Sequence, residues 1–242
     1  MTILPITYLG SVDYFARLTG AGERPAGARE NKLNPGAPRA VIDVGENWVK
    51  QTTRNRCEIM TSGGIAALTV PVHGYGPKIA TRDVRIDNSK RWQHIHWTSI
   101  VSAYRSSPFF DHYEERFAPI YGRRFEFLID LDFELLAVLT TALGLPDGTM
   151  NISREWVEAA PGDVDLRGKK ALRRPVFSSA SALPPSSALP PSSALPPTPA
   201  RSSAREYTQV FSDRMAFEPG LSIVDLLFCE GPDWRKFMAP GV

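Results

Sequence analysis

The sequence predicts an α/β fold of a single domain, in which a mixed sheet from the N-terminal half packs against helices from about residues 92–143 and a C-terminal helix. Three observations predict this class. Short apolar runs bounded by turn residues fill the first half of the chain, and apolar residues at helical spacing follow from about residue 92. A chain of 242 residues with 43% hydrophobic residues also suits one domain with a sizeable core.

The first half of the chain carries most of the strand signals. Residues 3–9 have the pattern of a buried strand, and the apolar positions after Ser11 predict a helix capped by that serine. Glycines in the turn at residues 62–64 predict a hairpin, because glycine readily adopts the positive φ of a tight turn. Further strands are expected at residues 40–44, 57–61 and 66–72, and around Val84 and Ile86.

Helical spacing then takes over. Over residues 92–105 the apolar residues fall on one arc of about half the circumference, at ~100° per residue, which predicts a core-facing helix. A second helix covers residues 110–120, with Pro119 disturbing its end. A third is expected from about Asp132, as its N-cap, to Gly144.

A short amphipathic helix is expected near the C-terminus. Ser222 and Asp225 have the spacing of a capping box, and Gly231 followed by Pro232 predicts the end of the helix.

Two segments, residues 20–38 and 178–204, are interpreted as disordered insertions. The second contains SALPPS twice and then SALPPT, whose paired prolines favour extended polyproline II. A linker or repeat expansion in a surface loop is the favoured interpretation. A docking segment for a protein partner is the alternative.

Charge, cysteines and motifs exclude several classes of protein. The net charge of +2 is too small for the strong positive field of a nucleic-acid partner. Cys57 and Cys229 build no disulfide framework or zinc motif, and we expect no metal and no cofactor. We found no phosphate loop, GxSxG or HExxH motif. Without a targeting signal or a stretch that spans a bilayer, we expect a cytoplasmic protein that is not integral to a membrane.

Two histidines lie in the predicted helix at residues 92–105. His94 and His96 would be about 160° apart on a helix, which disfavours a shared metal. His96 falls inside the apolar arc, where burial and a hydrogen-bond partner would set its pKa. We therefore take it as a candidate general base, with a satisfied core histidine as the more frequent alternative.

A polar run precedes the strand that holds Cys57. Arg54 and Arg56 would point to one side of an extended chain and bind a carboxylate or diphosphate, with Lys50 and Asn55 beside them. An exposed polar strand edge is the equal alternative. Alternation places Cys57 on the opposite face, so we interpret it as a structural cysteine.

Acidic residues give two weaker candidates. Asp130-Leu131-Asp132 matches the DxD pattern of metal-dependent glycosyltransferases, but helix capping is the favoured explanation. Asp43 ends an apolar strand, where α/β proteins often present residues of a binding site.

Several runs together resemble the bacterial WbqC-like proteins, over most of the chain outside the two insertions. They are PITYLGSVDYFARL, VIDVGENWVKQTTRNRCEI, ALTVPVHG, VRIDNSKRWQHIHWTSIVSAYRSSPFFDHY and FEPGLSIVDLLFCEGP. The resemblance implies that residues 1–242 form one WbqC-like domain. Members of this family are similar to proteins encoded among genes for O-antigen and other surface polysaccharides, and a glycine-transferase role has been suggested for one such protein.

The resemblance therefore implies transfer of an acyl or aminoacyl group, glycyl being one, to an amino sugar. The expected small-molecule partners are a sugar nucleotide and an acyl donor. His96 would act as the base, Tyr104 as an orienting hydroxyl, and Arg54, Arg56 and Lys50 as an anion clamp. The family motif overlies His96, Asn55 and Arg56 but not Cys57. A non-catalytic binding or adaptor protein of the same pathway is the alternative.

Overall fold

The computed structural model describes residues 1–20, 40–74, 79–168 and 205–238. Apart from Gly20, the expected insertions at residues 20–38 and 178–204 lie outside the described residues.

A four-stranded parallel sheet forms one side of the fold. Its strands are β1 (Thr2–Pro5), β2 (Ala40–Asp43), β5 (Met150–Ser153) and β6 (Val164–Asp165), in the order β5-β2-β1-β6. The two central strands carry the apolar runs that the sequence singles out, and every residue of β2 is buried. The α/β class is confirmed.

The outer strands differ from the expectation of a sheet built from the N-terminal half. β5 has the sequence MNIS and β6 has VD, so neither shows the apolar run of a central strand. Backbone pairing in parallel register with β2 and β1 defines them instead.

The predicted hairpin is confirmed, but it forms a separate two-stranded sheet. β3 (Arg56–Thr61) pairs antiparallel with β4 (Gly64–Thr69), and Gly64 has a φ of 102°. The strand expected around Val84 and Ile86 is reduced to isolated bridges, one of them between Val72 and Ile86.

The helices follow their local signals closely, with one exception. The helices are α1 (Val12–Thr19), η1 (Thr81–Asp83), α2 (Trp92–Tyr104), α3 (Phe110–Tyr121), α4 (Leu128–Ala142), α5 (Ile223–Glu230), η2 (Gly231–Trp234) and α6 (Arg235–Met238). Ser11 caps α1 by accepting a hydrogen bond from the backbone N–H of Tyr14, as predicted. The exception is α4, which begins at Leu128 rather than at Asp132.

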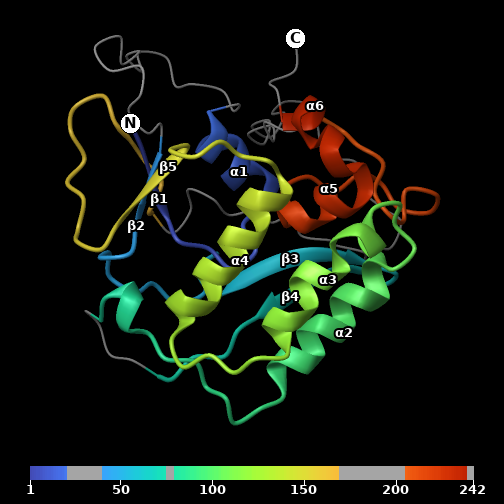
Figure 1. Cartoon of the computed structure of the whole chain (residues 1–242), viewed down its shortest axis with the longest axis horizontal. Helices are drawn as coiled ribbons and strands as arrows, with labels where there is room; N and C mark the ends of the chain where they lie inside the picture. The colour runs from blue at the N-terminus through green and yellow to red at the C-terminus, as the bar shows by residue number, and fades with distance from the viewer. Residues whose placement is uncertain (21–39, 75–78, 169–204, 239–242) are drawn as a thin grey trace, which may run out of the picture.

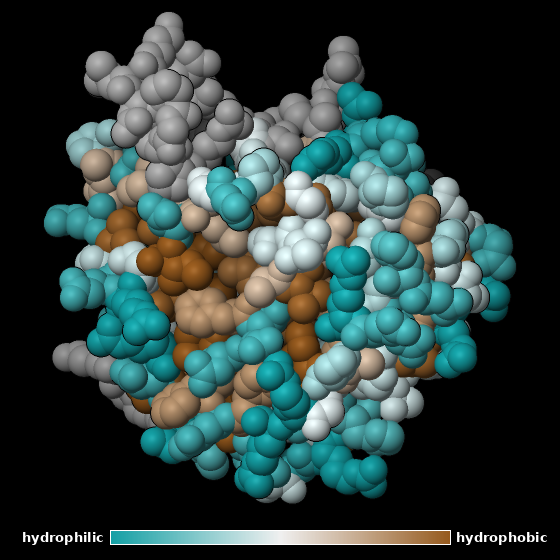
Figure 2. Space-filling model, viewed as in Figure 1, coloured by the Kyte–Doolittle hydropathy of each residue, from teal (hydrophilic) through white to brown (hydrophobic). Residues whose placement is uncertain are grey.

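Helix α4 lies between the two halves of the fold. Figure 1 shows the parallel sheet on one side, α2, α3 and α5 on the other, and α4 crossing in front of the β3–β4 hairpin. Phe228 of α5 joins the aromatic core, with its ring centroid 5.3 Å from that of Phe110 and 5.4 Å from that of Tyr104. Apolar side chains gather around α4 in Figure 2, whereas the surface over α2 and α3 is mainly hydrophilic.

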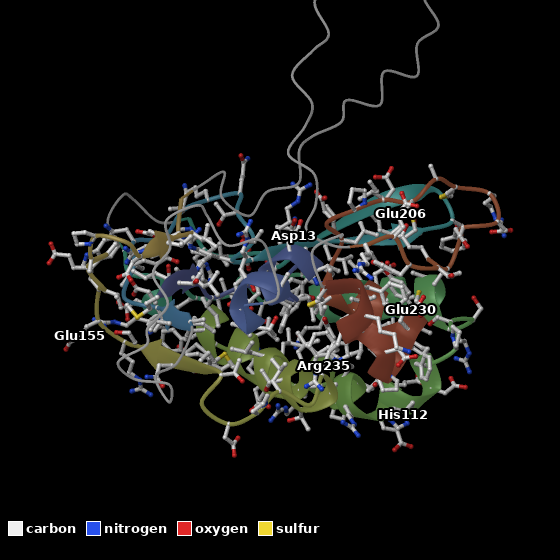
Figure 3. The ribbon with its side chains drawn as sticks, turned by 90° about the horizontal axis from the view of Figure 1, so that it is seen from above. Asp13, His112, Glu155, Glu206, Glu230 and Arg235 are labelled. Atoms are coloured by element: carbon white, nitrogen blue, oxygen red, sulfur yellow. The ribbon has the colours of Figure 1, made fainter. Side chains whose placement is uncertain are left out.

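The C-terminal helices close the fold against α4. Ser222 caps α5 as predicted, and the chain turns at Gly231 into η2 and α6. Arg235 (Figure 3) donates a hydrogen bond to the carbonyl of Gly144, at 2.8 Å, just beyond the end of α4. Within the described residues, no helix is long and apolar enough to cross a membrane.

Candidate active site around His96 and Asp132

Three side chains from distant parts of the chain form a buried hydrogen-bonded chain. Tyr8 lies just after β1, His96 on α2 and Tyr121 at the end of α3. The Tyr8 hydroxyl lies 2.8 Å from Nδ1 of His96 and 2.9 Å from the Tyr121 hydroxyl. The fold thus brings the predicted base into contact with Tyr8 and, through Tyr8, links it to Tyr121; the sequence analysis singled out neither phenol.

His96 is neutral at physiological pH. Burial lowers its pKa from 6.5 to about 4, and a hydrogen bond with the backbone of Thr69 opposes this only in part. A neutral imidazole can accept a proton at one ring nitrogen. Where the Tyr8 hydroxyl donates to Nδ1, the ring proton lies on the other nitrogen.

Aromatic neighbours fix the orientation of this chain. The ring of Trp92 meets that of His96 edge to face, with centroids 5.3 Å apart. Trp97 stacks on Tyr121 at 5.5 Å. Trp92 lies four residues before His96 on α2, so its side chain occupies the same face of the helix.

The second element of the site is Asp132, which is completely buried within α4. Among the described residues, neither of its carboxyl oxygens has a hydrogen-bond partner. Burial raises its pKa well above the ordinary value, which favours the protonated, uncharged form of the carboxyl group. Its charge, where present, would raise the pKa values of Tyr8, Tyr14, Tyr121 and Cys57, so Asp132 lies within electrostatic range of these buried groups.

The interpretation of Asp132 as a helix cap is therefore wrong. Helix α4 starts one turn earlier, and the residue before it is Phe127, which makes no side-chain cap. The apolar pattern of the sequence is consistent with this earlier start of the helix. The buried apolar positions Leu128, Leu131, Leu135 and Leu139 follow helical spacing, and Asp132 lies on their face.

Arg54 does not form the expected anion clamp. Its guanidinium is buried and donates to the Glu46 carboxylate through Nε at 2.7 Å and through Nη2 at 2.5 Å. It also donates to Thr52 Oγ1 at 3.0 Å and to the carbonyl of Arg167 at 2.9 Å. These partners engage the guanidinium within the protein, so it is not presented to a ligand.

The rest of the polar run is dispersed. Arg56 is 42% exposed in its side chain and lies 3.4 Å from Glu58, while Lys50 is exposed. The Asn55 side chain donates to the carbonyl of Val70 at 2.9 Å. Residue 54 precedes β3, so the strand alternation that would align the two arginines does not apply to it.

Asp43 lies at the carboxyl edge of the parallel sheet in an ionic network. Its carboxylate accepts hydrogen bonds from the backbone N–H of Gly45, at 2.8 Å, and of Val157, at 3.1 Å, and from Nη1 of Arg167. Arg167 also binds Asp165 through Nη2 at 2.6 Å. No pattern in the sequence indicates the pairing of Asp43 with Arg167, because the two residues lie 124 positions apart.

Cys57 is a buried free thiol on β3. Burial raises its pKa above the ordinary range, so it lacks the thiolate character of a nucleophile, in line with the structural interpretation. In the part of the chain that the structure describes, no group of three or more His, Cys, Asp or Glu side chains is arranged to hold a metal ion.

Tyr104 lies eight residues after His96 on α2, about 12 Å along the helix at 1.5 Å per residue. Its hydroxyl donates to Asp225 at 2.8 Å and accepts from the backbone N–H of Met60 at 3.1 Å. The Asp225 carboxylate also accepts from the hydroxyl of Tyr207 at 2.6 Å, so it does not complete the predicted capping box. Tyr104 therefore ties α2 to β3 and α5.

Replacing Tyr104 with Phe should lower the free energy of unfolding by about 1–3 kcal/mol, because a buried carboxylate and a backbone N–H each lose a partner. Urea denaturation of the wild type and the variant measures this. An exposed-face control on the same helix, Ser102→Ala, should change stability by no more than about 0.5 kcal/mol. Unchanged stability in Tyr104→Phe would contradict the structural role.

Two comparisons with known proteins give matches to this chain. The sequence profile described as the WbqC-like protein family matches residues 41–167, more than half of the chain. The chain is also 27% identical over 204 residues to the uncharacterized protein Rv1507c of Mycobacterium tuberculosis, covering 78% of this chain and 84% of that protein. No solved structure matches the chain. The matched region contains His96, Tyr121 and Asp132, and the chain belongs to the WbqC-like protein family.

Proposed function

We propose that this protein transfers an acyl or aminoacyl group, glycyl being one, to the amine of an amino sugar in the biosynthesis of O-antigen-type surface polysaccharide. The pathway is taken from what the resemblance to WbqC-like proteins implies, and the chain belongs to that family. The observation that carries the chemistry is the buried, unpaired carboxyl of Asp132, within electrostatic range of Tyr8 and Tyr121 in the His96–Tyr8–Tyr121 chain. A buried polar group without a partner costs stability, and such costs concentrate at functional sites.

The hydrogen-bonded chain supplies a base. As the amine nitrogen forms its bond to the acyl carbon, it must lose a proton. In our proposal this proton passes to the Tyr8 hydroxyl while Tyr8 gives its own to Nδ1 of His96. His96 returns the proton to the leaving group as the bond between the acyl carbon and that group breaks.

Asp132 supplies a donor rather than a base. A carboxyl group kept neutral by burial donates a hydrogen bond, and it stabilises the oxyanion that develops on the acyl oxygen. The Tyr121 hydroxyl, 2.9 Å from that of Tyr8, donates to the Tyr8 oxygen when Tyr8 donates to His96, and so orients Tyr8. The exposed cations Lys50 and Arg56 are left as the proposed contacts for the diphosphate of a sugar nucleotide, because Arg54 is committed to Glu46.

A transfer assay on paired histidine variants tests the proposal. The full-length protein is incubated with nucleotide amino sugars and either acyl-CoA or glycyl-adenylate, and the product is detected by mass spectrometry. His96→Gln should lower the turnover at least about a hundredfold, because it removes the proton acceptor. His94→Gln is the matched control, since His94 is exposed on the same helix and should leave the turnover unchanged.

The thermal unfolding of His96→Gln shows whether a loss of turnover comes from lost chemistry or from a damaged fold. If His96→Gln unfolds at the same temperature as the wild type but loses turnover, the base assignment is supported. Equal turnover in both variants would exclude His96 as the base. If no donor and acceptor pair gives a product, the non-catalytic binding protein becomes the better explanation. The adaptor alternative that uses the Pro-rich residues 178–204 lies outside the described residues.

A further inference from the structure

An exposed tryptophan lies at the carboxyl edge of the parallel sheet, among residues that take no part in the His96 chain. Trp156 follows β5 and is 59% exposed. The guanidinium carbon of Arg167 lies 3.8 Å from the centre of its ring, so the cation covers one face. Because Arg167 itself is buried, the indole rests on the protein with its other face available to a ligand.

The backbone that follows Trp156 is held by two hydrogen bonds of Val157. The N–H of Val157 donates to Asp43 at 3.1 Å, and Arg167 donates to the carbonyl of Val157 at 2.8 Å. Gly45 lies directly beneath this segment, where a Cβ atom would come within 2.6 Å of the Trp156 nitrogen. Only glycine permits this close approach without displacing the segment.

The Trp156 ring rests on Arg167, whose buried ion pairs are well defined and cost desolvation free energy. Arg167 is held by Asp165 at 2.6 Å and by Asp43, which is completely buried. Buried ion pairs of this kind carry a desolvation penalty, and here they position a side chain that gains little burial itself. A rigid aromatic side chain held in solvent loses little entropy when a ligand stacks on it.

The location is one where α/β proteins bind ligands. Asp43 ends β2, Trp156 follows β5 and Arg167 follows β6, so three of the four parallel strands contribute at their carboxyl ends. Ligands of open parallel sheets bind in this position. Residues 154–158 carry Glu155 and Glu158 against Arg154, while the cation on the ring, Arg167, is paired with Asp43 and Asp165. Glu155 projects from the edge of the molecule in Figure 3.

We propose that the open face of Trp156 is a stacking platform for the pyranose ring of a sugar. The C–H groups on one face of a pyranose suit the negative face of an indole, and carboxylates accept hydrogen bonds from sugar hydroxyls. The same carboxylates disfavour a phosphate at this position. The inference rests on the proposed function in taking the sugar acceptor as the ligand class, but the binding is measurable without any transfer.

The test follows the indole N–H signals of the full-length protein labelled with ¹⁵N-tryptophan. The Trp156 signal is assigned by its loss in Trp156→Phe, and methyl glycosides of 2-amino-2-deoxyhexoses and of their N-acetyl forms are titrated in, with UMP as a separate probe. We expect the glycosides to shift the Trp156 signal and UMP to leave it in place. Trp156→Ala should weaken glycoside binding about tenfold, because the sugar face loses its apolar contact.

Two further variants keep the test selective. Ile152→Ala removes a neighbouring apolar side chain that is 47% exposed, and it should leave glycoside affinity unchanged. Gly45→Ala displaces the segment and should weaken binding without removing the ring. Glycosides that shift no signal, or only those of other tryptophans, would overturn the proposal, and so would a Trp156 shift caused by UMP alone.

The experiments distinguish a failure of the stacking proposal from a failure of the proposed transferase function. Glycoside binding at Trp156 in a protein that transfers nothing leaves the platform standing and refutes the proposed function. Transfer with the same KM for the sugar in the wild type and in Trp156→Ala refutes the platform and leaves the proposed function standing.

Discussion

Replacing Arg54 with Ala should lower the free energy of unfolding by about 3–5 kcal/mol, since it leaves the buried Glu46 carboxylate without its partner. Burial already raises the pKa of Glu46, and the Arg54 guanidinium opposes that rise. Without Arg54, Glu46 must remain charged without a partner or take up a proton. Either response costs stability at neutral pH.

The neighbouring arginine provides the matched control. Arg56 has an exposed side chain and a long contact of 3.4 Å with Glu58, so Arg56→Ala should change stability by no more than about 0.5 kcal/mol. Urea denaturation of both variants at pH 7 measures the difference. A stable Arg54→Ala protein would return Arg54 to the list of ligand contacts, because its ion pair would then be dispensable to the fold.

The second large effect, that of Asp132→Leu, is an increase in the free energy of unfolding. Asp132→Leu should raise the free energy of unfolding at pH 7 by about 2 kcal/mol, because an unpaired buried carboxyl is replaced by an apolar group of similar branching. The exposed Asp130 on the same helix is the control, and Asp130→Leu should change stability by no more than about 0.5 kcal/mol.

The stability that Asp132→Leu gains over the wild type should increase with pH. The folded-state pKa of Asp132 is raised, so the unfolded chain releases the proton at a lower pH than the folded chain. The unfolded state therefore binds fewer protons above about pH 4, and the wild type loses stability as pH rises. The difference between Asp132→Leu and the wild type should grow from pH 4 to pH 7. A difference that shrinks over this range would show that Asp132 is ionised and paired in the fold.

Local signals in the sequence predicted much of the fold. Ser11 and Ser222 cap their helices, and the Gly64 turn joins the predicted hairpin, because each depends on residues that are close in the chain. Strands β5 and β6 were not predicted because they are too short to show a clear apolar pattern, and because their partners lie more than a hundred residues away.

The site was predicted only in part. His96 was found because its place on the apolar arc of a helix is a local property. Its partners Tyr8 and Tyr121 lie on other elements, and no pattern in the sequence connects them. Arg54 was predicted to bind an anionic ligand because of its charge. In the structure Glu46, eight residues earlier in the chain, is its counterion. Asp132 was assigned to a helix cap because acidic side chains are rarely buried without a hydrogen-bond partner. The same rarity makes the buried, unpaired Asp132 a candidate functional residue.

The most direct measurement of the central claim is the transfer rate of Asp132→Leu beside Asp130→Leu. We predict that Asp132→Leu is more stable than the wild type at pH 7 and yet transfers the acyl group to the amino sugar at least about a hundredfold more slowly, because one oxyanion donor is lost. Asp130→Leu should match the wild type in both properties. An Asp132→Leu protein that transfers at the wild-type rate would contradict the account.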